Sequence, residues 1–275
     1  DGTLCFDRRT IDDEIMQVLL SAPQYGHELA FATTRSYRDC LATLGPELSQ
    51  KLVVGLNGGL VYENGRLIFE RSIDERAYQI LVDWCQTYNL PFIVDDHFDY
   101  SGQILEKMPF ISRVDPLEKA QFLSLDAIKN PIKMVIYMGN HENLVEETLA
   151  QFANEKSLEV FYDEGEKCIY LNPAETHKAK TLVEHVGNDV VVFGNDRNDI
   201  ELFKESLYAV QVGDFSVLTE FADEQIKLVG DYQSAIAAKI LEVFAFFGKI
   251  EKISLRTDEK RDISGYTIFN PKYFS

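Results

Sequence analysis

The chain has 275 residues, 45% of them hydrophobic, which is enough to bury the core of one large domain or of two smaller ones. Its 27 Lys and Arg residues against 45 Asp and Glu residues give a formal net charge of −18, which repels nucleic acid and anionic membrane surfaces and argues against both as partners. An anionic substrate would therefore need a local cluster of positive charge or a bound metal.

The N-terminal part of the chain alternates helices with short apolar strands. Each strand ends in a small polar or glycine-rich loop, and this alternation is typical of a parallel α/β sheet. The expected elements are a helix that begins within residues 10–13, a strand at 28–32, a helix capped by Ser36 and ended by Gly45 and Pro46, and a strand at 51–56.

Hairpins replace this strict alternation in the middle of the chain. Asn64 and Gly65 predict a tight turn between strands at 60–62 and 67–69. The elements expected after it are a helix from a capping box at 72–75, strands at 92–94 and 132–138, a helix carrying Leu144, Leu149 and Phe152, and a hairpin of 158–162 with 167–171. Because paired hairpins and helices of this kind form α+β units, we expect residues 72–172 to be inserted into an α/β core of residues 1–71 and 173–275.

The alternation of helices and strands resumes in the C-terminal part. The expected elements are a helix at 177–185, a strand at 190–193, a helix through Phe203, a strand at 208–212 and a long helix at 232–247. The residues from Lys249 onward remain unassigned.

One loop in this part is rich in oxygen ligands. The four apolar residues at 190–193 predict a strand buried on both faces, and Asn195, Asp196, Asn198 and Asp199 follow at its carboxyl end. Ligands bind at that end of strands in open α/β sheets, and such oxygens suit Mg²⁺. Turns of this composition also cap helices, so the segment alone leaves both interpretations open.

Five short motifs lie along the chain in a fixed order. They are Asp1-Gly2-Thr3-Leu4, Phe31-Ala32-Thr33-Thr34-Arg35, Asn57-Gly58-Gly59, Lys178 and Gly194-Asn195-Asp196-Arg197-Asn198-Asp199. In this order and spacing they resemble the haloacid dehalogenase superfamily of phosphohydrolases, in particular its Cof-type branch with a large inserted cap. The resemblance covers about residues 1 to 245. It implies a Rossmann-like parallel sheet core with an inserted α+β cap domain at 72–172.

The resemblance gives Asp1 a catalytic role. The opening motif of the family is Asp-x-Asp-Gly-Thr, and Asp1 matches its second Asp. By that match Asp1 would protonate the leaving oxygen and then deprotonate the attacking water, while its backbone carbonyl helps to hold Mg²⁺. The nucleophile of the family would stand two residues before Asp1, so we expect residues upstream of this sequence. The alternative is a simple Asp-Gly-Thr turn.

The resemblance also implies a phosphate-binding set. Thr33 matches the hydroxyl that hydrogen-bonds the transferring phosphoryl group, and Thr34 stands where the family usually has Gly. Asn57 and Gly58 would contact the phosphate from the next loop, and Lys178 would neutralise the phosphoryl charge. The helix dipole disfavours a cation in the first turn of a helix, so an anionic partner would explain Lys178. The alternatives are a helix cap for Thr33, a plain turn for Asn57 and a solvated surface lysine for Lys178.

The same resemblance favours metal binding by the loop after residue 193. The family pattern there is Gly-Asp-x-x-Asn-Asp, so Asn195 replaces an Asp that normally ligates the metal. An amide oxygen ligates Mg²⁺ without a full negative charge. We expect Asp1, Asn195 and Asp199 to hold Mg²⁺, directly or through water, and Asn198 to brace the loop.

The leading functional hypothesis is a Mg²⁺-dependent phosphatase that hydrolyses a small phosphorylated metabolite, such as a sugar phosphate, through an aspartyl-phosphate intermediate. Asn195 motivates an alternative, a catalytically weak phospholigand-binding or regulatory protein on the same fold. The sequence does not separate hydrolysis from phosphoryl transfer by a mutase. Specificity would lie in the cap, where the candidates are Asp95, Asp96, His97 and Lys133.

Cysteine usage and hydropathy indicate the compartment. Cys5, Cys40, Cys85 and Cys168 lie far apart without a CxxC pair, as is typical of reduced thiols in the cytoplasm. No apolar run approaches the length of a membrane span. We expect a cytoplasmic protein that acts on a small-molecule phosphate ester and binds neither nucleic acid nor membranes. The sequence leaves the oligomeric state open.

Overall fold

The computed structural model describes the backbone of residues 1–254 and the side chains of residues 1–248. The chain divides into two compact units, one of Asp1–Leu29 with Asp189–Ser275 and one of Ala30–Asn188. The core and cap boundaries expected from the sequence are a different division and stay a prediction. Of the segment left unassigned from Lys249 onward, residues 249–254 continue the last helix, which ends at Ser254, and the rest lies outside the described residues.

The first unit is built on a three-stranded parallel sheet. Its strands, in spatial order, are β10 (Val191–Gly194), β11 (Tyr208–Val212) and β12 (Glu224–Ile226). Its helices are α1 (Asp13–Leu20), α6 (Ile200–Glu205), α7 (Ser216–Thr219) and α8 (Tyr232–Ser254), with 3-10 turns at Ala22–Tyr25 and Arg197–Asp199. The start of α1 at Asp13 falls within the predicted range, and Asp12 caps the helix by accepting a hydrogen bond from the backbone N–H of Glu14.

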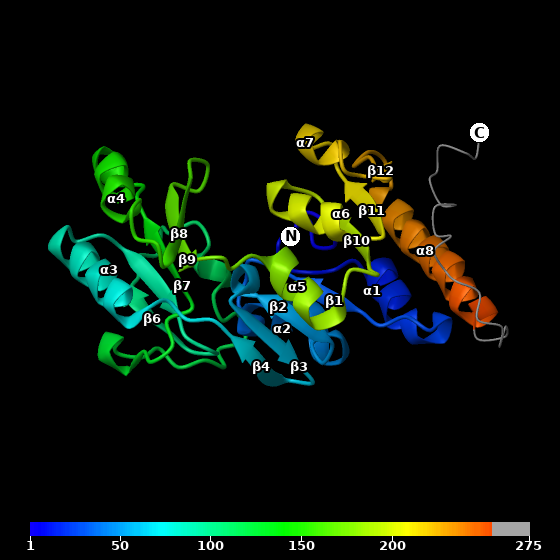
Figure 1. The fold of residues 1–275 in the computed structure, drawn as a ribbon, viewed down its shortest axis with the longest axis horizontal. Coiled ribbons are helices and arrows are strands. Elements are labelled where there is room, and N and C mark those ends of the chain that lie inside the picture. Colours follow the sequence, from blue (N-terminus) through cyan, green and yellow to red (C-terminus); the bar gives the residue numbers. More distant parts are fainter. Residues whose placement is uncertain (255–275) are drawn as a thin grey trace. The chain divides into compact units, whose positions relative to one another are not determined.

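The long helix α8 completes the core of the first unit. It packs against α1 (Figure 1). The ring of His27 stacks on Phe244 at a centroid distance of 5.2 Å, and its Nε2 lies 3.0 Å from the Phe244 carbonyl oxygen. Among the described helices, none has the length and apolar character needed to span a membrane.

The burial of β10 differs from the prediction. Val192 and Gly194 are buried, whereas Val191 and Phe193 are half-buried. In the part of the chain that the structure describes, β10 pairs only with β11 and is therefore an edge strand. Successive residues of a strand face opposite sides of the sheet, and here only one side is fully covered. The expectation of a strand buried on both faces is wrong for these residues.

The second unit contains two sheets, of which the first begins with the expected parallel pair. Its strands, in spatial order, are β1 (Ala30–Ala32), β2 (Leu52–Gly55), β3 (Leu60–Glu63) and β4 (Arg66–Glu70), with β1 parallel to β2 and the other pairs antiparallel. Asn64 and Gly65 both have positive φ, as the predicted tight hairpin turn requires. With the parallel strands of the first unit, this sheet confirms the α/β class.

Two helices belong to this part of the second unit, α2 (Tyr37–Leu48) and α5 (Lys178–Val186). Ser36 caps α2 by accepting a hydrogen bond from the backbone N–H of Asp39 at 3.2 Å, which confirms the predicted cap. The helix is interrupted at Gly45, whose φ of +68° is left-handed, so the predicted break before Pro46 is present.

The second sheet of this unit has five antiparallel strands. They are β6 (Tyr100–Gln103), β5 (Phe92–Asp95), β7 (Lys133–Tyr137), β9 (Cys168–Pro173) and β8 (Leu158–Asp163) in spatial order. The sequence analysis did not anticipate β6. It also placed the start of α3 (Glu75–Thr87) at a capping box from Ser72, whereas the N-cap is Asp74, which accepts from the backbone N–H groups of Arg76 and Ala77.

The two faces of the five-stranded sheet pack differently. On one face, α3 and α4 (Val145–Phe152) cover a large core that includes Leu81, Phe92 and Phe152 (Figure 1). The other face carries Ile93 and Val135 in a smaller cluster with the irregular segment around Met108. Two buried charged residues, Asp95 and Lys133, lie opposite each other at the end of this second face.

Candidate active site

The first unit places the opening turn of the chain against the loop that follows β10. Thr3 Oγ1 donates a hydrogen bond to Asn195 Oδ1 at 3.0 Å, although the two residues are 192 positions apart. Gly2 has a φ of +70°, and a Cβ atom there would lie 2.2 Å from Asn195 Nδ2. The amide of Asn195 therefore packs directly on the Gly2 backbone, which only glycine permits. The structure thus brings the Asp1-Gly2-Thr3 motif and Asn195 together.

Two carboxylates brace this loop from inside. Asp199 Oδ2 accepts hydrogen bonds from the backbone N–H of Asn195 at 2.8 Å and of Asp196 at 3.2 Å. The Asp196 side chain accepts from the N–H of Asn198 at 2.9 Å, and together these contacts form a capping box. A Cβ at Gly194 would lie 2.7 Å from the Asp199 Cβ, so glycine lets Asp199 close over the strand end. Asp196 and Asp199 do the bracing that was expected of Asn198.

The oxygens gathered in the first unit fit Mg²⁺ in kind. The carboxylate of Asp199, the amide oxygen of Asn195 and the carboxylate and carbonyl of Asp1 are hard donors. Mg²⁺ usually takes one or two carboxylates and fills its remaining positions with water and substrate phosphate. Within the described residues, no group of three or more His, Cys, Asp or Glu side chains is arranged to hold a metal ion. A metal held by Asp1, Asn195 and Asp199 stays a prediction.

In the second unit, the loops after β1 and β2 are hydrogen-bonded to each other. The N–H of Asn57 donates to the Thr33 carbonyl at 3.0 Å, and the N–H of Leu56 donates to the Arg35 carbonyl at 2.8 Å. Thr33 Oγ1 accepts from the N–H of Arg35 at 3.2 Å. Ser36 and not Thr33 caps the following helix, so the helix-cap alternative for Thr33 does not hold. Thr33 and Asn57 lie together where two parallel strands end.

The first turn of α5 lies against the second of these loops. Gly58 has a φ of +101°, and a Cβ atom there would lie 2.7 Å from the carbonyl carbon of His177. Thr181 Oγ1 donates to the Gly58 carbonyl at 2.9 Å. Lys178, the first residue of α5, is only 7% exposed and is not a solvated surface lysine. These contacts gather Asn57, Gly58 and Lys178 at a helix N-terminus, where backbone N–H groups and the dipole favour an anion.

His177 has a role that the sequence analysis did not assign. It is the N-cap of α5, and its Nδ1 accepts a hydrogen bond from the N–H of Lys180 at 3.3 Å. Histidine is not among the favoured N-cap residues, so the sequence pattern carries no signal for this contact. The cap fixes where the helix begins and therefore puts Lys178 at its first position.

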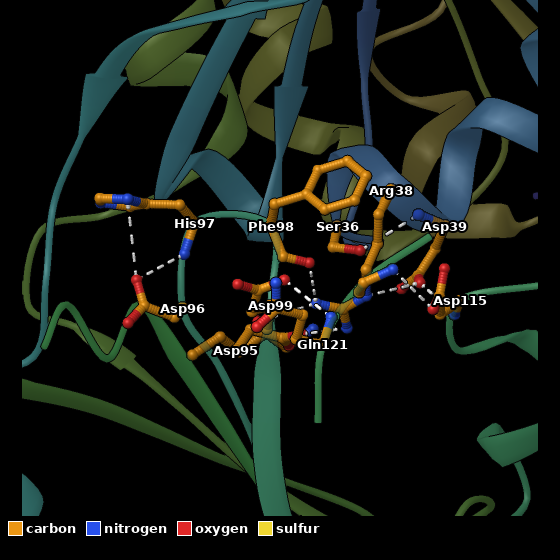
Figure 2. Close-up of polar contacts among 12 residues, drawn as sticks. Ser36, Arg38, Asp39, Asp95, Asp96, His97, Phe98, Asp99, Asp115 and Gln121 are labelled. Carbon is orange, nitrogen blue, oxygen red and sulfur yellow. Dashed lines mark hydrogen bonds and ion pairs between the residues drawn. The ribbon is translucent and has the colours of Figure 1, made fainter. Parts of the chain in front are cut away.

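A buried group of charges in the second unit includes Arg38 and Asp39, which the sequence analysis missed (Figure 2). Arg38 on α2 is only 1% exposed, and its guanidinium pairs with the Asp95 carboxylate. Its Nε lies 3.2 Å from Asp39 Oδ1, and one terminal nitrogen donates to the carbonyls of Phe98 and Asp99, both at 3.1 Å. Burial alone lowers the pKa of Arg38, but the carboxylates of Asp95 and Asp39 outweigh it and raise that pKa.

Two of the expected specificity candidates are engaged in holding loops. Asp96 accepts hydrogen bonds from the backbone N–H groups of His97, Lys129 and Asn130 at 2.7, 3.0 and 3.3 Å. The His97 ring pairs with the Glu70 carboxylate. These contacts give Asp96 and His97 a structural role. The other two candidates, Asp95 and Lys133, belong to the buried group of charges.

A family model for haloacid dehalogenase-like hydrolases matches residues 1–237 of the chain. The chain belongs to this family. The resemblance stated from the motifs is therefore confirmed, and so is the prediction of an enzyme of the haloacid dehalogenase type. No curated protein sequence matches the chain.

Solved structures share the fold of this haloacid dehalogenase-like hydrolase. A haloacid dehalogenase-like hydrolase from Bacteroides thetaiotaomicron is 20% identical, with a TM-score of 0.74 over 88% of this chain and 96% of that one. A haloacid dehalogenase-like hydrolase from B. subtilis is 16% identical, with a TM-score of 0.68 over 88% and 96%. A sugar phosphatase of haloacid dehalogenase subclass IIB is 18% identical, with a TM-score of 0.68 over 89% and 96%. At these identities the likeness shows the fold.

The predicted site residues of this hydrolase fall into two sets. The expected metal ligands Asp1, Asn195 and Asp199 belong to the first unit. The expected phosphate-binding residues all belong to the second unit, and these are Thr33, Thr34, Asn57, Gly58 and Lys178. Within each unit, segments far apart in the sequence are joined by the hydrogen bonds and close approaches described above.

Proposed function

We propose that this protein is a Mg²⁺-dependent phosphatase that hydrolyses a small phosphorylated metabolite, such as a sugar phosphate, through an aspartyl-phosphate intermediate. The observation that carries the proposal is the meeting of the Thr33 loop, the Asn57 loop and the first turn of α5, with the buried Lys178 at its first position. Hydroxyl, backbone N–H and ammonium groups so gathered suit an anion. Membership of the hydrolase family and the fold shared with a sugar phosphatase support a phosphate ester as that anion.

In the proposed mechanism, the Thr33 hydroxyl and the Lys178 ammonium bind the phosphoryl oxygens and stabilise the charge of the transition state. The family's nucleophile, which its motif puts two residues before the position of Asp1, would attack phosphorus as the bond to the leaving oxygen breaks. Asp1 donates a proton to that oxygen and later takes one from the water that hydrolyses the aspartyl-phosphate. Three further residues contact the phosphate, and these are Thr34, Asn57 and Gly58.

The proposed metal ligands are the carboxylate of Asp199, the amide of Asn195 and the backbone carbonyl of Asp1. Bound Mg²⁺ would supply positive charge to the phosphoryl group during transfer. Asp199 contributes in a second way, because its Oδ2 holds the backbone of the loop that carries Asn195. The amide of Asn195 is held in place by Thr3 and Gly2.

We also propose that residues 72–172 form the cap that selects the substrate, in a protein of the cytoplasm. The support for the cap is that α3, α4 and all but the last residue of the five-stranded sheet lie within this range. In the described residues, none of these five strands pairs with a strand of another sheet. The support for the compartment is that the four cysteines are buried thiols, as expected in a reducing environment.

The test is hydrolysis of an aryl phosphate by the purified full-length protein with Mg²⁺ and with EDTA. We expect turnover that stops with EDTA. Lys178→Met and Asp1→Asn should each lower kcat by at least about a hundredfold, the scale of losing one transition-state contact or one acid/base group. The matched control is Lys180→Met, because Lys180 is half-buried and pairs with Glu175 at 3.3 Å, and its kcat should stay near the wild-type value. Absence of turnover with every divalent metal would refute the proposal.

A second candidate function is a catalytically weak protein that binds a phosphorylated ligand. Asn195 favours it, because an amide where the family normally has a carboxylate removes one formal charge from the metal shell. The identity of the residue two positions before Asp1 discriminates between the two functions. A carboxylate there supports the phosphatase, and Asn or Ala supports the binding protein.

A further inference from the structure

Lys133 is a buried lysine that touches the loop proposed to bind phosphate. It is the first residue of β7 and only 6% exposed. Its ammonium Nζ donates a hydrogen bond to the backbone carbonyl of Thr34 at 2.9 Å, across 99 positions of sequence. The five-stranded sheet is thus joined to the loop after β1, and both lie in the second unit.

The contact with Thr34 determines how one peptide group is turned. The Thr34 carbonyl and the Arg35 N–H belong to the same planar peptide, so fixing the carbonyl on one side fixes the N–H on the other. That N–H donates to Thr33 Oγ1 at 3.2 Å. Lys133 therefore sets the orientation of the Thr33 hydroxyl through the peptide that follows it.

Lys133 is itself held by neighbours on two adjacent strands. Asp95 on β5 is its direct partner in the antiparallel ladder, so the two side chains share a face of the sheet. Its Nζ lies 5.0 Å from the centre of the Tyr170 ring. Burial lowers the pKa of Lys133, while the carboxylates of Asp95 and Asp39 oppose that change.

Arg38 joins this arrangement to the helix that follows the loop. It lies on α2, two residues after the cap Ser36, and its guanidinium pairs with Asp95 (Figure 2). It also lies 4.6 Å from the centre of the Tyr100 ring on β6. Asp39 accepts a hydrogen bond from the N–H of Asp115 at 2.8 Å. The short segment from Thr33 to Ser36 is therefore held by Lys133 at the Thr34 carbonyl. The helix that follows this segment is held by Arg38.

The charges of this cluster argue for a role beyond stability. Lys133 and Arg38 balance Asp95 and Asp39, and all four side chains are buried. Replacing such buried charges with apolar residues is often neutral or stabilising, so their presence alone is weak evidence of a stabilising purpose. Lys133 donates its hydrogen bond directly to the Thr34 carbonyl in the loop after β1, which indicates that the cluster holds this loop in place.

We propose that Lys133, held by Asp95 and Arg38, is a positioning residue that fixes the peptide after Thr34 and thereby aims the Thr33 hydroxyl at the phosphoryl group. The functional half of this proposal rests on the proposed phosphatase activity. The structural half, the fixing of the loop, does not.

The test compares Lys133→Met with Lys133→Arg. Met removes the ammonium at similar length, so kcat for an aryl phosphate should fall by roughly ten- to a hundredfold, as expected when a reacting group is displaced by up to about 1 Å. Arg keeps a charged donor and should restore most of that loss. The matched control is Lys129→Met, because Lys129 is exposed and its Nζ donates to the Asp126 carbonyl at 3.1 Å, away from the loop. Its kcat should equal that of wild type.

Hydrogen exchange separates positioning from a loss of stability. Peptides that contain the N–H groups of Arg35, Leu56 and Asn57 should exchange at least about tenfold faster in Lys133→Met, while the ladder at Val135 keeps its protection. Unchanged exchange in the loop would overturn the proposal, even if kcat fell. So would an equal loss of protection at Val135, because that would be a general destabilisation.

A double variant covers the case in which Lys133→Met fails to fold. Lys133→Met leaves one excess buried carboxylate, and Lys133→Met with Asp95→Asn removes one charge of each sign. This variant should fold and still show the faster loop exchange, and a loop as protected as in wild type would overturn the proposal. If the wild-type protein lacks phosphatase activity, the proposed function fails, whereas the exchange experiment still decides whether Lys133 fixes the loop.

Discussion

Replacing Gly58 with alanine should force the proposed phosphate-binding loop away from the first turn of α5. A side chain at a φ of +101° costs about 1–2 kcal/mol. The added Cβ would lie 2.7 Å from the carbonyl carbon of His177 and 2.9 Å from Thr181 Oγ1, so backbone must move. Overpacking of this kind costs typically about 1–3 kcal/mol. The sum of roughly 2–5 kcal/mol corresponds to a Tm lower by about 4–20 °C.

The matched control is Gly230→Ala. Gly230 has a φ of +60° and nothing within 4 Å of the added Cβ, so it carries only the conformational cost of about 1–2 kcal/mol. The difference between the two variants therefore measures the close approach of the loop to α5. We expect Tm to be lower in Gly58→Ala than in Gly230→Ala by about 2–12 °C in thermal unfolding.

The activity of the two variants should differ in the same direction. A shift of the Gly58 loop moves Asn57 relative to Lys178, and kcat for an aryl phosphate should fall by about tenfold or more. Gly230→Ala should keep the wild-type kcat. Equal losses of Tm in the two variants would refute the reasoning, because they would show that the loop and helix have room for a methyl group.

Three further predictions address the metal, the pH and the loop. Asn195→Asp should lower the Mg²⁺ concentration needed for half-maximal activity and Asp199→Asn should raise it, because each substitution changes one formal charge at the proposed metal. If the dependence of activity on Mg²⁺ is unchanged in both variants, this loop does not bind the metal. Burial raises the pKa of Glu224, but hydrogen bonds from Lys239 and Tyr208 outweigh burial and lower this pKa below 4.5. The ionised Glu224 carboxylate therefore stabilises the fold above pH 4.5, and this stabilisation is lost as the pH falls through the lowered pKa. Glu224→Gln should therefore lower Tm at about pH 7 but not at about pH 3, and a gap that stays constant would contradict this. Ser36→Ala should cost about 1–2 kcal/mol by removing the cap of α2, read as a fall in Tm; an unchanged Tm would show that the cap contributes nothing.

Local patterns in the sequence predict much of the fold. The apolar runs predict β2 and β11, Ser36 predicts the start of α2, and the pair Asn64 and Gly65 predicts a hairpin whose two turn residues have positive φ. These features depend on residues within a few positions of one another. Patterns failed for β10, because whether a strand is covered on both faces depends on what packs on each side of the sheet.

Part of the candidate site follows from the same local patterns. Thr33 and Asn57 each follow a predicted strand, and parallel strands end at the same edge of a sheet, so their neighbourhood could be anticipated. Family motifs singled out Lys178, but its burial at the first position of α5 emerged only in the structure. The cap provided by His177 carried no signal, because a histidine before a helix is not a favoured cap.

By itself, the sequence determined most of the elements, the α/β class and the family, because each of these is written in short periodic patterns and in motifs of a few residues. The tertiary structure alone decided the charges that hold the site. Arg38 is a charged helical residue that local reasoning places at the surface, yet it is fully buried by residues about 60 positions away. Lys133 and Thr34 are 99 positions apart, and no local pattern encodes a hydrogen bond between a strand side chain and a distant loop carbonyl. Such contacts exist only once the chain has folded and placed the two segments within reach of each other.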